Sequence, residues 1–154
     1  MKMIINILAV GNVKENYYRD KIGEYVAEIK KKIDIRLITV KDCPIPKGAG
    51  ERINDKIKQQ EGQDILSHIG GRDYVVALCI EGKALNEGDF SSFVRLAEDK
   101  MCSTLTFVIG GSLGLHENVI KRADFKLSFS PMTFPHQLMR VMLLERMKAA
   151  ICDR

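Results

Sequence analysis

Residues 104–140 read TLTFVIGGSLGLHENVIKRADFKLSFSPMTFPHQLMR, and this stretch predicts the architecture of the whole chain. Its first apolar run, 105–109, has the length and composition of a buried strand, and it stops at the glycine-rich GGSLG. A short helical pattern follows, and a second short strand over 125–129 then leads through SPMTFP into a long apolar helix. We therefore expect two strands whose carboxyl ends each lead into a loop that opens a helix.

The rest of the chain repeats the same alternation. Continuous runs of aliphatic and β-branched side chains predict three further strands, at residues 3–10, 33–40 and 74–80. Apolar side chains spaced by three and four residues predict three further long helices, at residues 15–32, 51–69 and 89–100. Five strands that alternate with helices predict a single α/β domain over residues 1–154, with a parallel sheet flanked by helices.

The bulk composition is that of an ordinary globular protein, with 45% hydrophobic and 29% charged residues. No apolar run reaches the roughly eighteen residues of a membrane span, and no signal-peptide pattern is present, so we expect a cytoplasmic protein. The four cysteines are widely spaced and have no partner histidines at ligand spacing, which favours reduced thiols and no metal. The net charge of +4 suits a polyanionic partner without requiring one.

The two loops of residues 104–140 are the best candidates for a binding site. Ligands of parallel α/β sheets lie outside the carboxyl ends of the strands, where such loops gather. Gly110, Gly111 and Gly114 would allow backbone N–H groups to approach a ligand closely. A lone GGxxG is a weak signal, because glycines often only turn the chain. The second loop, from Phe129 onward, strengthens the prediction because both loops fall within one short span.

VIGGSLGL followed by LSFSPMTFPHQLMR resembles the signature of the rRNA large subunit methyltransferase H family, a group of small knotted enzymes of the SPOUT class. The segments ILAVGNVKENYY, EGQDIL and VALCIEGKAL are also similar to this family, so the resemblance covers nearly the whole chain. It implies a SPOUT-type α/β knot with a C-terminal trefoil. Periodicity alone would argue against a knot, since knots are nearly absent from proteins.

The resemblance further implies a methyltransferase that uses S-adenosylmethionine to methylate N3 of a pseudouridine in the rRNA of the large ribosomal subunit. Apolar side chains and backbone amides of the two loops suit an adenine ring. The cofactor-contacting positions of the family correspond to Leu78, Gly110, Phe129, Ser130, Pro131, Met132, Thr133 and Phe134, to which we add Gly111 and Gly114 of the glycine loop.

His136 and Arg140 are the candidate catalytic residues. The imide nitrogen of a pseudouridine must lose its proton before or during methyl transfer, which requires a positioned base or a cationic field. His136 and Arg140 are four residues apart at the start of the last helix, so they share a face beside the second loop. We predict that His136 orients the substrate or handles the proton, and that Arg140 contacts a phosphate or the base. Two alternatives remain open: His136 only caps the helix, or His116 is the basic group.

The last predicted helix, residues 135–151, carries apolar side chains nearly all the way round. Such a helix is either buried within the core of one chain or covered on one side by a partner. Because members of the family resemble antiparallel dimers, we predict a homodimer through this C-terminal helix, bound to large-subunit rRNA in the ribosome.

Two other functions remain open. After Leu144 the chain reads ERMKAAICDR, without the aromatic and basic tail usual in the family. A ribosome-binding, cofactor-binding family member with weak or no catalysis is therefore the alternative function. A nucleotide-binding domain that uses GGSLG as a phosphate loop is a third interpretation, although the Gly-Lys-Ser/Thr ending of such loops is missing.

Overall fold

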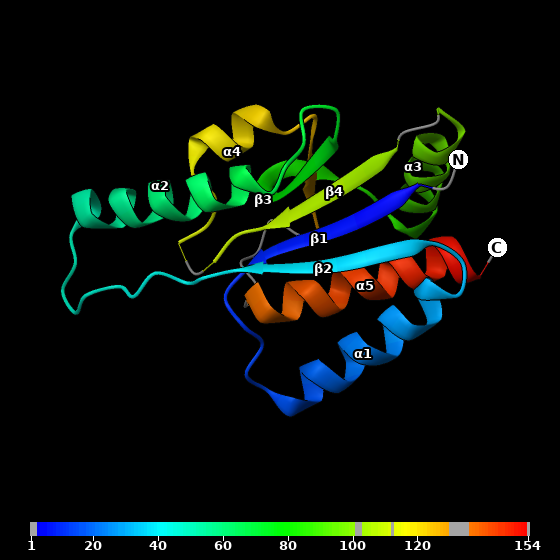
Figure 1. Cartoon of the computed structure of the whole chain (residues 1–154), viewed down its shortest axis with the longest axis horizontal. Coiled ribbons are helices and arrows are strands. Elements are labelled where there is room, and N and C mark those ends of the chain that lie inside the picture. The colour runs from blue at the N-terminus through cyan, green and yellow to red at the C-terminus, as the bar shows by residue number, and fades with distance from the viewer. Residues whose placement is uncertain (1–2, 101–102, 112, 130–135, 154) are drawn as a thin grey trace.

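A computed structural model describes residues 3–100, 103–111, 113–129 and 136–153. Five strands form one sheet in the order β2-β1-β4-β3-β5, and every neighbouring pair is parallel (Figure 1). The strands are β1 (Ile4–Val10), β2 (Asp34–Val40), β3 (Tyr74–Ala84), β4 (Thr104–Ile109) and β5 (Phe125–Ser128). The helices are α1 (Asn16–Lys30), α2 (Glu51–Ser67), α3 (Glu87–Asp99), α4 (Glu117–Arg122) and α5 (His136–Cys152). The predicted fold class, an α/β domain with a parallel sheet, is confirmed.

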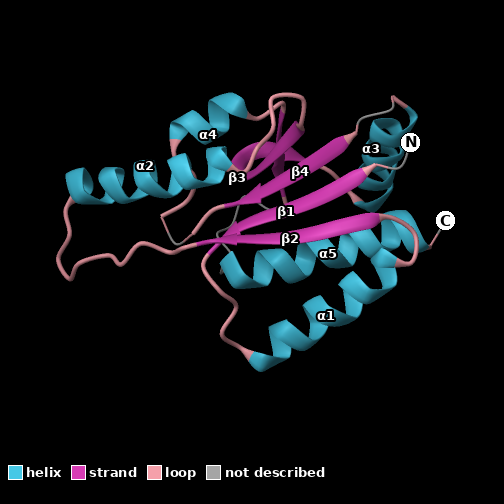
Figure 2. Ribbon diagram, viewed as in Figure 1, coloured by secondary structure: helices cyan, strands magenta, loops and turns pink. Residues whose placement is uncertain are grey.

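Helices cover both faces of the sheet (Figure 2). The side chains of β1 point alternately to the two faces of the sheet. Ile5 and Ile7 pack with α1, α3 and α5, while Leu8 and Val10 pack with α2 and α4. A strand covered on both faces needs apolar residues at nearly every position, which is why β1 is an apolar run interrupted only by Asn6, without alternation.

β3 is longer than the sequence predicts. The predicted end of this strand at residue 80 is wrong, because β3 continues to Ala84 through an irregularity at which Leu78 and Lys83 both pair with Leu127. Gly82 explains this path: a Cβ there would lie only 2.7 Å from the carbonyl carbon of Leu127. The two backbones can approach this closely only because Gly82 has no side chain.

α5 lies between α1 and α3 and packs against the sheet (Figure 2). Leu143, Leu144 and Met147 are fully buried within this one chain. Met142 and Ala149, which lie on the other side of the helix, are only half-buried. One chain therefore buries most of the apolar surface of α5. Residues 130–135, on whose path the predicted trefoil knot depends, lie outside the described residues, so the knot remains a prediction.

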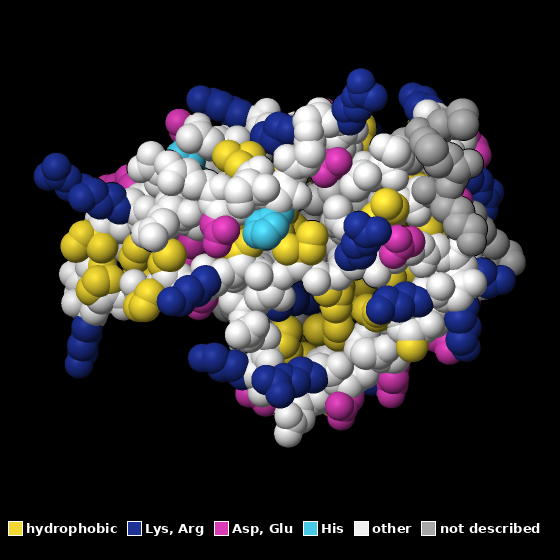
Figure 3. Space-filling model, in the orientation of Figure 1, with side chains coloured by type: hydrophobic (Ala, Val, Ile, Leu, Met, Phe, Trp, Pro, Cys, Tyr) yellow, Lys and Arg dark blue, Asp and Glu magenta, His cyan; other side chains and the backbone are white. Residues whose placement is uncertain are grey.

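α1 approaches the sheet at its C-terminal end and diverges from it toward its N-terminal end (Figure 1). The divergence leaves a hollow with a hydrophobic floor, around which Lys and Arg side chains gather (Figure 3). This hollow opens on the side of the molecule where β2 forms the edge of the sheet.

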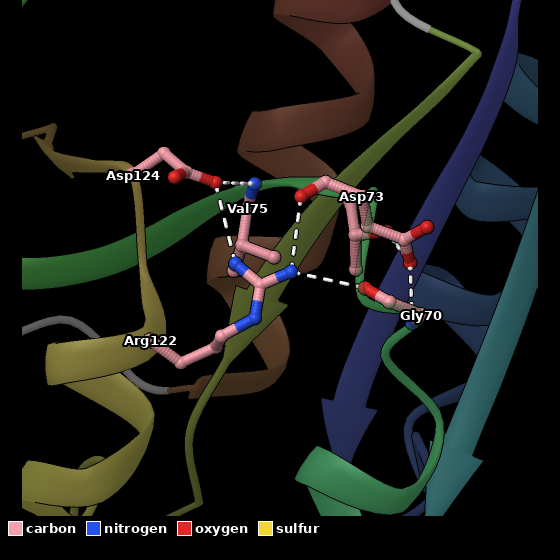
Figure 4. Close-up of polar contacts among 6 residues, drawn as sticks. Gly70, Asp73, Val75, Arg122 and Asp124 are labelled. Carbon is pink, nitrogen blue, oxygen red and sulfur yellow. Dashed lines mark hydrogen bonds and ion pairs between the residues drawn. The ribbon is translucent and has the colours of Figure 1, made fainter.

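Arg122 joins the end of α4 to the turn before β3 (Figure 4). Its Nη2 donates hydrogen bonds to the carbonyl oxygens of Gly70 at 2.9 Å and Asp73 at 3.1 Å. Its Nη1 lies 3.4 Å from Oδ2 of Asp124, and the same oxygen accepts the Val75 N–H at 2.9 Å. The guanidinium therefore fixes where β3 enters the sheet.

Replacing Arg122 by Ala should lower the free energy of unfolding by about 1–3 kcal/mol, because partly buried carbonyls and a carboxylate lose a charged donor. Urea denaturation measures this change. The matched control is Lys121→Ala, which removes an exposed pair to Glu117 and should change the stability by less than about 0.5 kcal/mol. Equal stability of the two variants would contradict the role given to Arg122.

Candidate functional site

Three of the predicted cofactor-binding positions lie at neighbouring strand ends. Gly110 directly follows β4, Leu78 lies near the end of the regular part of β3, and Phe129 directly follows β5. Ala77 pairs with Val108 and Leu78 with Leu127, so the three positions share one edge of the sheet. Leu78 is 7% exposed and Phe129 half-buried, and because β3 and β5 both lie on the same side of β4, they place apolar surface on one side of the glycine loop.

Gly110 and Gly111 of the glycine loop are packed so closely that a side chain at either position would crowd neighbouring atoms. A Cβ on Gly110 would lie 2.8 Å from the carbonyl carbon of Gly114, and a Cβ on Gly111 would lie 3.1 Å from Cγ1 of Val10. Gly114 has a φ of +82°, a left-handed conformation that favours glycine, and its N–H donates to the Gly111 carbonyl at 3.0 Å. Close packing at Gly110 and Gly111, and the positive φ at Gly114, therefore favour glycine at all three positions of the predicted motif.

Phe129 is supported from α5. The guanidinium carbon of Arg146 lies 5.3 Å from the centre of the Phe129 ring, a cation–π distance. Nη1 of Arg146 also donates to the Leu85 carbonyl at 3.0 Å, which fixes the guanidinium between the end of β3 and the ring. The ring is therefore held in place beside the strand ends.

Part of the predicted site lies outside the described residues. This applies to Ser130, Pro131, Met132, Thr133 and Phe134, and to the side chain of His136, whose backbone begins α5. The first turn of α5 is positioned by Gln137, whose Oε1 accepts the backbone N–H of Lys14 at 3.1 Å. His116 caps α4, since its Nδ1 accepts the Asn118 N–H at 3.2 Å.

Arg140 links α5 to the end of β1. Its side chain is only 7% exposed, and Nη2 donates to the carbonyl oxygens of Val10, at 2.7 Å, and Gly11. Burial lowers the pKa of the guanidinium below its usual value. Nε of Arg140 is one of three buried side-chain polar atoms in the described part of the chain without a hydrogen-bond partner. Because Ala9 pairs with Ile109, Arg140 lies one strand away from Gly110.

Glu61 is a site residue to which the sequence analysis gave no role. It is 4% exposed on the inner side of α2, and its Oε2 accepts the Cys43 N–H at 3.1 Å. A Cβ on Gly111 would lie 3.6 Å from the other carboxyl oxygen, Oε1. Glu61 thus contacts both the loop after β2 and the glycine loop. The usable signal is its spacing, four residues after Ile57 and four before Ile65, on the apolar side of the helix.

Burial is the main cause that raises the pKa of the Glu61 carboxyl, and the neighbouring Asp42 raises it further. The hydrogen bond from the Cys43 N–H acts in the opposite direction. A side-chain hydrogen bond with Asp42 also contributes to the raised pKa of Glu61.

The described residues hold neither a membrane-spanning helix nor a metal-binding cluster of side chains. No helix in them is long and apolar enough to cross a membrane. No three His, Cys, Asp or Glu side chains in the same part of the chain are grouped so that they could hold a metal ion.

The fold and the glycine loop define a methyltransferase of the SPOUT class: a family model described as "Predicted SPOUT methyltransferase" matches residues 3–151. Within this class, the chain belongs to the rRNA large subunit methyltransferase H family. It is 45% identical over 148 residues to "Ribosomal RNA large subunit methyltransferase H" of Clostridium botulinum (strain Okra / Type B1), covering 96% of this chain and 93% of the relative. It is 43% identical over 148 residues to "Ribosomal RNA large subunit methyltransferase H 1" of Thermoanaerobacter pseudethanolicus, covering 96% of each.

Glu61→Gln should stabilise the protein more at about pH 7.5 than at about pH 4, relative to wild type. The native state holds the Glu61 proton more tightly than the unfolded chain, so wild-type stability falls as the pH rises from the ordinary pKa of 4.5 toward the raised native value. Gln keeps an acceptor for Cys43 and has no such loss. Urea denaturation at both pH values measures the difference.

Asp55→Asn, an exposed substitution on the same helix, is the control and should show no comparable pH dependence. Glu61→Ala should lower the stability at both pH values by about 2 kcal/mol, because the Cys43 N–H loses its acceptor and a cavity remains. A constant difference between Glu61→Gln and wild type across this pH range would refute the raised pKa.

Proposed function

We propose that this protein transfers a methyl group from S-adenosylmethionine to N3 of a pseudouridine in the rRNA of the large ribosomal subunit. Membership of the family and the names of its relatives support rRNA as the substrate. The observation that carries the proposal is the glycine loop, in which Gly110 and Gly111 pack closely against neighbouring atoms, next to Leu78 and Phe129 at the carboxyl edge of the sheet. An activity on ribosomes would place the protein in the cytoplasm.

The described residues fit S-adenosylmethionine. Gly110 and Gly111 carry no side chains, so their backbone groups are open to close approach by a ligand. Leu78 and Phe129 offer apolar walls for an adenine ring, and Ser130, Pro131, Met132, Thr133 and Phe134 complete the proposed cofactor site. When bound, S-adenosylmethionine supplies an electrophilic methyl group on a sulfonium, so no covalent nucleophile of the enzyme is needed.

Residues of this chain must promote the loss of the proton from N3. In the proposed reaction the proton leaves N3, the N3 electron pair forms the bond to the methyl carbon, and the bond from that carbon to sulfur breaks. We assign the proton, or the orientation of the base, to His136 at the start of α5. Arg140 is held by two carbonyl groups near the same edge, and its positive charge would stabilise negative charge that develops on the base.

We also propose a homodimer through α5. The half-buried residues Leu138, Met142 and Ala149 recur along one side of this helix at spacings of four and seven. They form an apolar strip that one chain leaves partly uncovered, which suits a symmetric contact with a second copy.

The function is tested by incubating the protein with labelled S-adenosylmethionine and ribosomes from cells that lack this methylation, followed by mass spectrometry of the nucleosides. We expect N3-methylpseudouridine. Binding of S-adenosylmethionine without methyl transfer would instead favour the ribosome-binding, weakly catalytic alternative, and the absence of both activities would reject the proposed site.

Gly110→Val should weaken the binding of S-adenosylmethionine by about 100-fold or more, equivalent to about 2.7 kcal/mol. The physical reason is that the new side chain must displace the Gly114 backbone. Isothermal titration calorimetry measures the affinity. The control is Gly71→Ala, where a Cβ meets no atom within 4 Å and wild-type affinity is expected. Unchanged affinity of Gly110→Val would remove the glycine loop from the cofactor site.

Met142→Asp should convert the dimer into monomers, because the contact would bury an unpaired charge. Sedimentation velocity measures the change, and circular dichroism checks that the protomer remains folded. Lys56→Asp, an exposed change on α2 on the opposite face of the sheet, should leave the sedimentation coefficient unaltered. A dimeric Met142→Asp variant would exclude this interface.

A further inference from the structure

The hollow between α1, β2 and α5 is a pocket to which nothing above gives a role. Its volume is about 370 Å³, within the roughly 300–1,000 Å³ typical of sites for small ligands. Ile22, Leu37 and Leu144 contribute apolar walls from α1, β2 and α5. Asn12, Arg19 and Arg140 contribute the polar part. The pocket therefore combines apolar surface with a small number of polar groups, as a ligand site requires.

The polar side chains of the pocket are mainly hydrogen-bond donors. The guanidinium groups of Arg19 and Arg140 can only donate, and none of the lining residues is acidic. Nε of Arg19 donates to the Val13 carbonyl at 2.7 Å, which holds this side chain at the pocket wall. A ligand that offers acceptors, such as carbonyl oxygens, is favoured over one that offers amino groups.

Arg140 supplies a second and independent observation. Its side chain is more than nine-tenths buried, it lines the pocket, and its Nε lacks a hydrogen-bond partner. A buried donor without an acceptor destabilises a fold, because it has lost its hydrogen bonds to water. A carbonyl oxygen of a bound ligand at this end of the pocket would supply the acceptor that the fold itself does not provide.

The polar end of the pocket lies close to the proposed methyl donor site. Asn12 follows the end of β1, Arg140 binds the Gly11 carbonyl there, and β1 pairs with β4 directly before Gly110. Neighbouring strands are about 4.8 Å apart. α5, which carries Arg140, also begins directly after the second cofactor loop. A ring whose carbonyl groups reached this end would therefore be near the transferred methyl group.

We propose that this pocket receives the acceptor base of the RNA, rotated out of its stack, and selects a uracil-type ring by its two carbonyl oxygens. Enzymes that modify a base commonly extrude it into such a pocket. The apolar walls would contact the ring, and the donors would bind the oxygens on either side of N3. Cytosine and adenine present amino groups that would face the arginines, so the pocket disfavours them.

The proposal rests on the proposed function and adds to it the place and the selection of the base. The Lys and Arg side chains that surround the hollow in Figure 3 suit the phosphates that flank an extruded nucleotide. The positive charge of Arg140 beside a carbonyl oxygen would also stabilise the base after N3 has lost its proton.

Gly23→Phe tests the pocket by filling it. Gly23 lies in α1 on the pocket wall, and a Cβ there meets no atom within 4 Å, so the variant should fold. We expect kcat/KM for methyl transfer to fall by about 100-fold, with an unchanged Kd for S-adenosylmethionine, because the base loses its contacts and the cofactor does not. The control is Ala27→Phe, an exposed change one helical turn further along α1, which should transfer methyl groups as wild type does.

Asn12→Asp tests the chemistry of the pocket. This change adds a carboxylate with almost no change in volume, and it should lower kcat/KM by about tenfold, because an acceptor would then face the carbonyl groups of the base. Wild-type rates in both Gly23→Phe and Asn12→Asp would overturn the proposal. A shift of the dimer–monomer equilibrium in Gly23→Phe, measured by sedimentation, would overturn it too, since a second copy of the chain would then occupy the pocket.

A cross-linking experiment separates this proposal from the proposed function. An RNA stem-loop with 4-thiouridine at the acceptor position is irradiated with the wild-type protein, and the attached peptides are identified by mass spectrometry. Cross-links to Ile22, Leu37 or Leu144 would support the pocket even if no methyl group is transferred, a result that would reject only the proposed reaction. No cross-link to α1, β2 or α5 would overturn the pocket, whatever the activity.

Discussion

Burial of the sheet on both faces is the constraint on which the rest of the structure depends. Helices cover both sides, so the strands carry apolar residues at most positions, with Asn6 and Thr106, which pair across β1 and β4, as buried polar exceptions. Most polar groups of the candidate site therefore lie at the carboxyl edge of the sheet, where the strands end. At that edge Gly110 lies so close to the Gly114 backbone that a side chain on it would clash, and the Gly114 N–H donates to the Gly111 carbonyl.

Two buried ionisable residues hold this edge from opposite faces of the sheet. Arg140 reaches the carbonyl groups of Val10 and Gly11 from α5, and Glu61 reaches the Cys43 N–H from α2. Val10 in turn packs where a side chain on Gly111 would lie. A buried charge is tolerated only when it has partners, so each residue fixes the backbone that satisfies it. Contacts with segments distant in the sequence therefore fix the position of the glycine loop.

The sequence predicts the order of elements and their approximate bounds, because continuous apolar runs and helical spacing are local patterns. It also predicts the edge at which Leu78, Gly110 and Phe129 meet, since strand ends of a parallel sheet share one side. It does not predict that β3 continues to Ala84, because that path depends on Gly82 meeting Leu127 across the sheet. The contacts of Arg140 with the end of β1 join residues about 130 positions apart, and no local pattern reports them.

The apolar residues of α5 show why burial within one chain and contact with a partner are hard to separate from the sequence. Both arrangements require an apolar helix, and the spacing is the same in either case. In the structure, Leu143, Leu144 and Met147 are buried by α1, α3 and the sheet of the same chain, whereas Met142 is only half-buried. The core around these α5 residues is therefore formed within one chain. A second copy would cover the remaining strip and would not form the core, so association can vary while the fold and the glycine loop persist.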